Sequence, residues 1–469
     1  MELRPPRQWD WLSAVPIVAG LYWLLGGNGA GWLLWALLPG ALLLCAGVAL
    51  LLMPGDHRVL GLMAGGAVLG TLATPLAWLA GGAGAAFYGA LLSVASLLAA
   101  GRAGLRREPL YTGAPPPQLS PSMDFKAGLD EALLGYFLCT ARVPSGEDAG
   151  RMCDDAIRAE AVMRERGWDA EPERMLPRPA PPDETFIERA RVWGFDHEVL
   201  RFDSGFMPPG ELPGAERWLG YEDNRRCHVR LLRHPGPPRP WLLCLHGYRM
   251  GTAWLDLSLF SPAWLHQRLG LNLIQPVLPL HGPRRAGLRS GDQFLDGDLL
   301  DLLYAEMQAL WDLRRTLAWL RTQEERPRIG VLGFSLGGYN AALLAAYESD
   351  LDFVVAGIPA VDFAATLWRF LPPLHLRYFA SRGLDEAHYR RVLSVVSPLS
   401  RPPLVDRSRL HIFAAAGDRV VPPSQALTLS AHWQVVPTWY QGSHLSVRRE
   451  PTTRAALAQA LAGVGWGVE

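Results

Sequence analysis

Charged residues are almost absent from the first hundred positions of this 469-residue chain. Between Asp10 and Arg102, only Asp56 and Arg58 are acidic or basic. A soluble domain cannot be built from such a stretch, whereas about 20 consecutive apolar residues are enough to span a bilayer as a helix. The sequence therefore predicts a membrane module in this region.

The chain also lacks net charge, lysine and any cysteine motif. Its 45 lysines and arginines balance 45 aspartates and glutamates, and Lys126 is the only lysine. This balance gives no indication of a nucleic-acid partner. The five cysteines have neither a C-x-x-C pair nor zinc-like spacing, which suits a reducing compartment but leaves a Cys139–Cys153 bridge open. We expect no metal and no cofactor.

The uncharged region divides into four apolar segments, at about 11–25, 32–53, 59–80 and 85–100. A cleaved signal peptide fits the first segment poorly, because further apolar runs follow at once. Arg4 and Arg7 precede the first segment, and Arg58 lies in the loop between the second and third. The fourth segment is followed by Arg102, Arg106 and Arg107. The positive-inside rule then predicts four spans with both ends in the cytoplasm. Because the spans contain no ionisable residue, an anchor is favoured over a transporter.

A different pattern occupies residues 328–338, where a short apolar run leads into a glycine-rich turn and a helix-forming stretch. The turn has the form G-x-S-x-G, with Ser335 between Gly333 and Gly337. Glycines at these positions allow a strand and a helix to approach closely, so that the serine is exposed on a strained turn. The pattern favours Ser335 as a nucleophile. Alone it is also compatible with an ordinary strand–helix turn in another α/β fold.

From about residue 198, strand-like and helix-like segments alternate, which is typical of an α/β domain. Eight strands are predicted, at 198–202, 227–233, 241–246, 273–279, 328–334, 353–358, 410–415 and 434–439. Helices are predicted at 295–321, 338–347, 423–433 and 451–461. In this order, with the G-x-S-x-G turn after the fifth strand, residues from about 198 to 468 resemble the α/β-hydrolase superfamily. The resemblance implies a mostly parallel eight-stranded sheet with flanking helices.

The third strand ends in His246-Gly247-Tyr248, which resembles the oxyanion loop of that family. Fixed backbone N–H groups there stabilise the negative charge of a tetrahedral intermediate. The resemblance implies that the donors are the N–H groups of Tyr248 and Leu336. His246 either shapes this loop or is a structural residue at the strand end, and the two roles are compatible.

The remaining expected partners of the serine lie at later strand ends. The seventh strand is followed by Gly-Asp418, and the last strand by Gly-Ser-His444. By resemblance, Asp418 orients the imidazole of His444, which acts as general base. Asp418 could instead cap the helix near residue 423, and Asp362, just after the sixth strand, is the alternative acid. The chain order Ser335, Asp418, His444 is that of the α/β-hydrolase fold.

The predicted organisation has three parts: a four-helix transmembrane module at 1–107, a proline-rich linker and helical extension at 108–195, and an α/β-hydrolase domain at 196–469. An aromatic, helical insertion at about 362–409 is expected to form a cap over the serine or to cover the sheet edge. A loop at 278–292 carries three arginines, Arg284, Arg285 and Arg289, which either border the pocket or are solvated.

These patterns predict a membrane-anchored serine hydrolase that cleaves a lipophilic acyl ester, such as a lipid or a thioester, beside membrane lipids. A peptidase or an acyltransferase on the same scaffold uses the same three residues, so the sequence does not separate these activities. The non-enzymatic alternative is a membrane scaffold with a hydrolase-like domain that is not catalytic.

Overall fold

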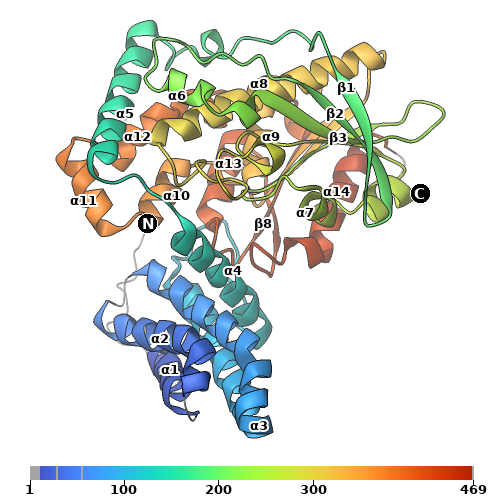
Figure 1. Cartoon of the computed structure of the whole chain (residues 1–469). Coiled ribbons are helices and arrows are strands. Elements are labelled where there is room, and N and C mark those ends of the chain that lie inside the picture. Colours follow the sequence, from blue (N-terminus) through green and yellow to red (C-terminus); the bar gives the residue numbers. More distant parts are fainter. Residues whose placement is uncertain (1–10, 28–29, 54–55, 467–469) are drawn as a thin grey trace. The chain divides into compact units, whose positions relative to one another are not determined.

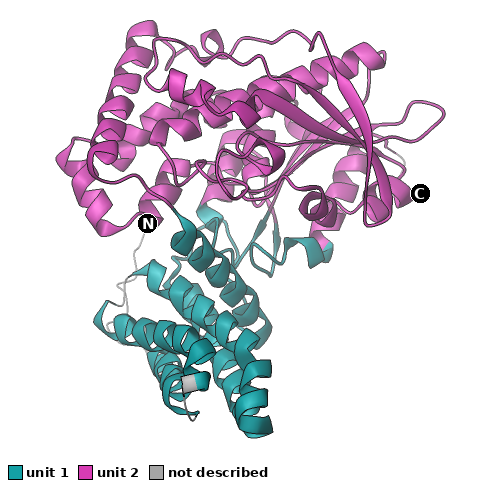
Figure 2. Cartoon of the chain, in the orientation of Figure 1, with its two compact units in different colours: residues 1–141, 414–424, 439–451 teal, residues 142–413, 425–438, 452–469 magenta. Residues whose placement is uncertain are grey.

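The computed structural model describes residues 11–27, 30–53 and 56–466. The chain forms two compact units, coloured separately in Figure 2. The first unit contains residues 1–141, 414–424 and 439–451, and the second contains residues 142–413, 425–438 and 452–469. Arg4 and Arg7, which contributed to the predicted membrane orientation, lie outside the described residues.

Helices dominate the first unit (Figure 1). They are η1 (Trp11–Ser13), α1 (Ala14–Leu25), α2 (Ala30–Leu52), α3 (His57–Arg107) and α4 (Pro121–Thr140). Trp23 is fully buried among them and donates its indole N–H to the hydroxyl of Ser93, 3.0 Å away. Trp32 stacks on Trp23 and donates to its carbonyl at 2.7 Å. The buried tryptophans therefore pack with their polar atoms satisfied.

Helix α3 consists of two arms rather than one rod. Gly82 interrupts it with φ 77° and ψ −173°, a backbone region that is essentially restricted to glycine. A Cβ added to Gly70 would lie 2.4 Å from the hydroxyl of Ser93, although a straight helix would separate these residues by about 34 Å. The two arms therefore fold back on each other, and they match the third and fourth predicted apolar segments.

Two of these helical stretches, Gly31–Leu52 and His57–Arg107, are long and apolar enough to cross a membrane by length and composition. The first apolar helix, Trp11–Leu25, is shorter. In the most apolar 18-residue stretch, 39% is buried in Gly31–Leu52 and 33% in His57–Arg107, so much of the apolar surface of both helices faces outward. The predicted number of spans and their orientation stay predictions.

The described residues also form a twisted sheet with the strand order β1-β2-β3-β5-β4-β6-β7-β8-β9 (Figure 1), and strands β1 to β7 lie wholly in the second unit. The strands are β1 (Phe186–Val192), β2 (Phe195–Asp203), β3 (Arg226–Leu232), β4 (Trp241–Leu245), β5 (Asn272–Pro276), β6 (Ile329–Phe334), β7 (Phe353–Gly357), β8 (Leu410–Ala415) and β9 (Thr438–Tyr440). Strands β5, β4, β6, β7 and β8 pair in parallel, whereas β1, β2 and β3 pair antiparallel. This is an α/β-hydrolase-like fold.

The sheet has nine strands, and the expected count of eight was therefore wrong by one. The strand that was missed is β1, in the segment assigned to the linker and helical extension. Five of its seven residues are exposed, three of them charged, because it is an antiparallel edge strand that pairs only with β2. A strand with no buried face lacks the alternation that sequence patterns detect.

The parallel strands β4 and β7 consist entirely of buried residues, as expected when helices cover both faces of a sheet. The flanking helices are α6 (Ala215–Leu219), α7 (Ala253–Leu259), α8 (Leu299–Gln323), α9 (Leu336–Ala345), α13 (Pro423–Trp433) and α14 (Pro451–Gly463). Helix α8 packs on α9, and 19 of its 25 residues are buried. This packing holds the start of α9 firmly against the sheet.

The insertion after β7 is helical, as predicted, with α10 (Phe363–Phe370), α11 (Pro373–Ser381) and α12 (Glu386–Val392). Helix α12 packs on α5 (Gly146–Arg166), where Arg391 pairs with Glu160 at 2.8 Å. The segment at 108–195 is thus shared, because α4 belongs to the first unit and α5 and β1 to the second. The compact units divide the chain differently from the three predicted parts. All five cysteines are free thiols, so Cys139 and Cys153 are not bridged.

Candidate active site

Ser335 lies on the turn between β6 and α9, as the sequence predicts. Its backbone has φ 58° and ψ −114°, a conformation that an L-residue adopts only under strain. Hydrogen bonds on both sides hold it there: Ser335 N–H donates to Gly357 O at 2.9 Å, and Tyr339 N–H donates to Ser335 O at 3.0 Å. This combination of strain and support is the geometry of a nucleophile elbow.

The two flanking glycines are required by close backbone approaches. A Cβ on Gly333 would lie 1.9 Å from the carbonyl oxygen of Gly337, and a Cβ on Gly337 would lie 1.9 Å from that of Leu245. Any side chain at either position would therefore collide with backbone. The G-x-S-x-G spacing follows from the packing of α9 against β4 and β6.

His246 is buried at the end of β4 and fastens this strand end to the next loop. Its Nε2 accepts the N–H of Leu278 at 3.0 Å, so its proton is on Nδ1, which donates to Gly247 O at 2.9 Å. Burial lowers the pKa of His246, and the imidazole is neutral. His246 is thus a structural residue. A Cβ placed on Gly247 would lie 3.8 Å from that of Ser335, so the loop expected to hold the oxyanion runs beside the serine.

Arg249 fixes the loop that follows Tyr248. It has a positive φ of 62°, and its guanidinium lies 5.2 Å from the centre of the Tyr248 ring. The same guanidinium pairs with Asp292 at 2.7 Å and with Asp296 at 3.3 Å. The backbone beside the predicted oxyanion donor is therefore tied to the loop after β5.

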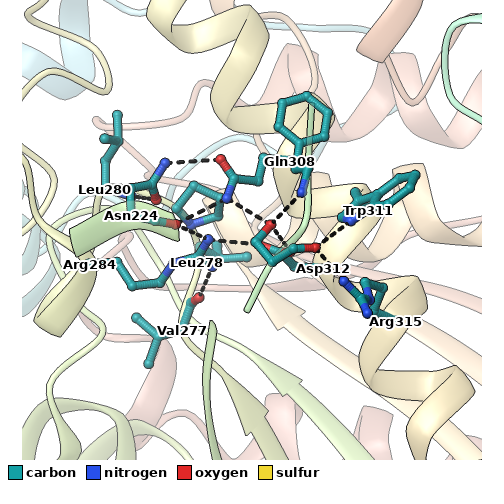
Figure 3. Close-up of polar contacts among 12 residues, drawn as sticks. Asn224, Val277, Leu278, Leu280, Arg284, Gln308, Trp311, Asp312 and Arg315 are labelled. Atoms are coloured by element: carbon teal, nitrogen blue, oxygen red, sulfur yellow. Dashed lines mark hydrogen bonds and ion pairs between the residues drawn. The ribbon is translucent and has the colours of Figure 1, made fainter. Parts of the chain in front are cut away.

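Arg284 neither borders a pocket nor faces solvent, and the expectations for this residue were wrong. Its side chain is 1% exposed and pairs with Asp312 on α8 at 2.7 Å. Figure 3 shows the guanidinium among the polar groups of the β5–α8 region, where it also donates to the carbonyls of Val277 and Asn224, each at 2.9 Å. Arg284 is thus buried with its two terminal nitrogens hydrogen-bonded, a set of partners that a sequence pattern does not reveal.

In the first unit, Asp418 and His444 form a hydrogen-bonded pair. Asp418 Oδ2 lies 2.8 Å from His444 Nδ1, and Asp418 is 2% exposed. The other oxygen, Oδ1, accepts the N–H groups of Val420 and Val421 at 2.9 and 2.7 Å. The carboxylate therefore holds the imidazole and the turn that precedes α13 together, and these bonds support the orienting role rather than a cap of that helix.

Charge around the imidazole favours its protonated form. Burial lowers the pKa of His444, but the Asp418 carboxylate, and beyond it Asp130, outweigh burial and raise the pKa above its ordinary value. Because Nδ1 is bonded to Asp418, Nε2 is the ring nitrogen that can exchange a proton with a substrate or nucleophile.

Asp362, the alternative acid, is engaged elsewhere in the second unit. Its Oδ1 accepts the N–H of Ala365 and caps α10 at 2.9 Å, and its Oδ2 pairs with Arg390 at 2.9 Å. These bonds are those of an ordinary helix N-cap. Of the two candidate acids, Asp418 is the one that is bonded to the His444 imidazole.

Two residues beside the Asp418–His444 pair, Asp130 and Arg419, could not be identified as candidates from the sequence. Asp130, on α4, accepts the backbone N–H groups of His444 and Arg419. Arg419 is 1% exposed and pairs with Glu131 at 2.8 Å and with Glu108, the residue after α3. These contacts join residues 288 to 314 positions apart, and only the folded chain brings them together.

The candidate residues therefore gather in two places. Ser335, Leu336 and the His246-Gly247-Tyr248 loop lie at the ends of β6 and β4 in the second unit, and the Asp418–His444 pair lies in the first. A serine on a strained turn and a carboxylate-bound imidazole are groups of the kind that acyl transfer uses.

No family model matches the chain. Solved structures to which this chain is similar include acetyl xylan esterase 1 from Thermoanaerobacterium sp. JW/SL YS485, at 14% identity and a TM-score of 0.41 over 69% of this chain and 96% of that one. Another is an acetyl xylan esterase from Paenibacillus sp. R4, at 16% identity and a TM-score of 0.42 over 69% of this chain and 98% of that one.

Two proteins from Mycobacterium tuberculosis are much more similar in sequence. Uncharacterized protein MT2702 of strain CDC 1551 / Oshkosh is 41% identical over 301 residues, which are 63% of this chain and 71% of that protein. Uncharacterized protein Rv2627c of strain ATCC 25618 / H37Rv is 40% identical over the same shares. The chain belongs to the family of these two mycobacterial proteins.

Proposed function

We propose that the protein is a membrane-anchored serine hydrolase of acyl esters. Ser335 Oγ attacks the acyl carbon while His444 Nε2 takes its proton, and the N–H groups of Leu336 and Tyr248 bind the resulting oxyanion. His444 then protonates the departing alcohol, and water hydrolyses the acyl-enzyme by the reverse sequence of proton transfers. Asp418 keeps the imidazole in the required tautomer.

The strained backbone of Ser335 is the observation that carries this proposal. A non-glycine residue at φ 58° and ψ −114° costs about 1–3 kcal/mol, and such strain persists where surrounding structure over-determines it, above all at active sites. The hydrogen-bonded Asp418–His444 pair supports the same chemistry independently, because it supplies an oriented base.

A fluorophosphonate probe and short-chain p-nitrophenyl esters test the nucleophile. The full chain should be labelled and should hydrolyse the esters, and Ser335→Ala should abolish both activities. Ser349→Ala is the matched control, because Ser349 is exposed and its hydroxyl donates to the neighbouring Asp350. Labelling that persists in Ser335→Ala, or an unlabelled wild-type protein that is correctly folded, contradicts the proposal.

We propose further that the acyl ester is lipophilic. The insertion after β7 exposes large apolar side chains, with Leu374 75% exposed on α11, and the first unit carries long apolar helices. A series of p-nitrophenyl esters from acetate to decanoate should show kcat/KM rising with chain length. Parallel assays with acyl-CoA and with aminoacyl amides distinguish a thioesterase or a peptidase, and a preference for acetate would contradict a lipophilic substrate.

The membrane anchor and its orientation have a separate test. We propose that helices α1, α2 and α3 span the membrane and that Arg107 lies on the cytoplasmic side, because arginines cluster at this end. A reporter fused after Arg107 should show activity typical of the cytoplasm, and the full chain should sediment with membranes after a carbonate wash. Extraction by carbonate, or periplasmic reporter activity, would contradict this placement.

A further inference from the structure

Helix α4 places one carboxylate under the loop that carries the proposed base. Asp130 is completely buried, and each of its two carboxylate oxygens accepts two hydrogen bonds. Oδ1 accepts the hydroxyl of Ser443 at 2.9 Å and the N–H of Leu445 at 3.0 Å. Oδ2 accepts the N–H of His444 at 2.8 Å and the N–H of Arg419 at 3.1 Å. Four donors thus converge on a single side chain.

This arrangement connects the two loops that form the Asp418–His444 pair. Three of the four donors belong to the base loop at residues 443–445, and the fourth is the N–H of Arg419, directly after Asp418. Because an ionised carboxylate accepts about four hydrogen bonds and donates none, it matches this donor set in number and kind. A protonated or amide side chain would direct a hydrogen toward at least one of these donors.

Several charged or titratable groups face the imidazole. Asp418 follows β8 and Asp130 lies on α4, while the Arg419 guanidinium is neutralised by Glu131 and Glu108. Tyr440, at the end of β9, is buried beside both aspartates, and its pKa is raised. Burial and repulsion from Asp418 raise the pKa of Asp130 to about 6, opposed by His444 and its own N–H donors. Asp130 is therefore ionised at neutral pH and contributes to the raised pKa of His444.

We propose that Asp130 is a positioning residue for the hydrolase, a carboxylate that holds the Asp418 and His444 loops in register and adds negative charge beside the imidazole. This inference rests on the proposed function. It gives α4, for which the sequence suggested no role, a defined part in the chemistry.

The test is Asp130→Asn in the full chain, assayed with a p-nitrophenyl ester across pH. Asparagine has the same shape but only one accepting oxygen, so two donors lose their partner. We expect kcat to fall by about 10- to 100-fold, with KM changed by less than about 3-fold. The acid limb of kcat/KM should also move to lower pH, because removing a negative charge lowers the pKa of His444 and leaves the base neutral in more acidic solution.

Asp124→Asn is the matched control on the same helix. Both oxygens of Asp124 bind the guanidinium of Arg102 at 2.6 Å rather than either loop, so this variant should retain both kcat and the position of the acid limb. If Asp130→Asn retains the wild-type kcat, or loses kcat without any shift of the acid limb, the inference is overturned. Equal losses in both variants would also overturn it, because they would indicate a general effect on α4.

Ser443→Ala provides a second, milder variant in case Asp130→Asn does not fold. It removes one of the four donors and should lower kcat by about 3-fold, and an unchanged kcat overturns the inference. The proposed function has its own criterion: if Ser335→Ala remains active, that function fails, whatever the variants of Asp130 show. If Ser335→Ala is inactive and Asp130→Asn is normal, only the role of Asp130 fails.

Discussion

At the residue scale, Ser335 combines the side chain that the proposed reaction needs with a backbone conformation that glycine would adopt more easily. Ser335→Gly should relieve the strain at φ 58° that Ser335→Ala retains, so the glycine variant should be more stable than the alanine variant by about 1 kcal/mol. Denaturant unfolding of the two inactive variants in the same detergent measures this difference directly. Equal stabilities would show that the elbow is not strained.

Arg419 is the second residue whose environment defines an expected outcome. Its guanidinium is 1% exposed and neutralises Glu131, which is equally buried, and Glu108. Arg419→Ala leaves these carboxylates without their partner, and it should lower the free energy of unfolding by about 3–5 kcal/mol. The exposed Arg407 offers the control, since Arg407→Ala should change the free energy of unfolding by less than about 0.5 kcal/mol.

At the scale of elements, the reversal of α3 depends on one glycine. Gly82 adopts φ 77° and ψ −173°, so Gly82→Ala should destabilise the helical bundle and lower its thermal midpoint in detergent. Gly84→Ala lies two residues further on with no atom within 4 Å of the added Cβ. It should leave the midpoint unchanged or raise it, because alanine favours helix. If Gly82→Ala has the same thermal midpoint as the wild-type protein, the two arms of α3 do not turn at this residue.

The elements also show which patterns were informative in the sequence. Buried parallel strands such as β4, β6 and β7 are continuous apolar runs, and their positions were predicted to within a few residues. The exposed edge strand β1 was missed because its alternation is masked by charged residues on both faces. Periodicity reports burial, so an element without a buried face carries little signal.

At the scale of the whole molecule, the helical segments before residue 142 and the proposed acid and base loops form one compact unit. A fragment that begins at residue 186 contains every strand of the sheet but lacks Glu108, Asp130 and Glu131. We expect this fragment to lose ester hydrolysis, because Arg419 and the N–H of His444 would lose their buried partners. The full chain assayed in parallel is the reference, and a fully active fragment would contradict this dependence.

The sequence by itself determined the local patterns. The G-x-S-x-G turn, the histidine at the end of β4 and the Gly-Asp418 turn each depend on residues a few positions apart, because sterics and hydrogen bonds act locally there. The charge-free first hundred residues likewise indicated apolar helices without any tertiary information. Their identification as a catalytic set stays a proposal.

Only the tertiary structure decided what surrounds these motifs. It buried Arg284 against Asp312, used Asp362 as a helix cap, and brought Asp130 beneath a loop more than 300 residues later. Burial of a charged side chain depends on partners that are distant in the chain, and no local pattern encodes which partners will meet. For the same reason, Asp130 became visible as a candidate functional residue only in the folded protein.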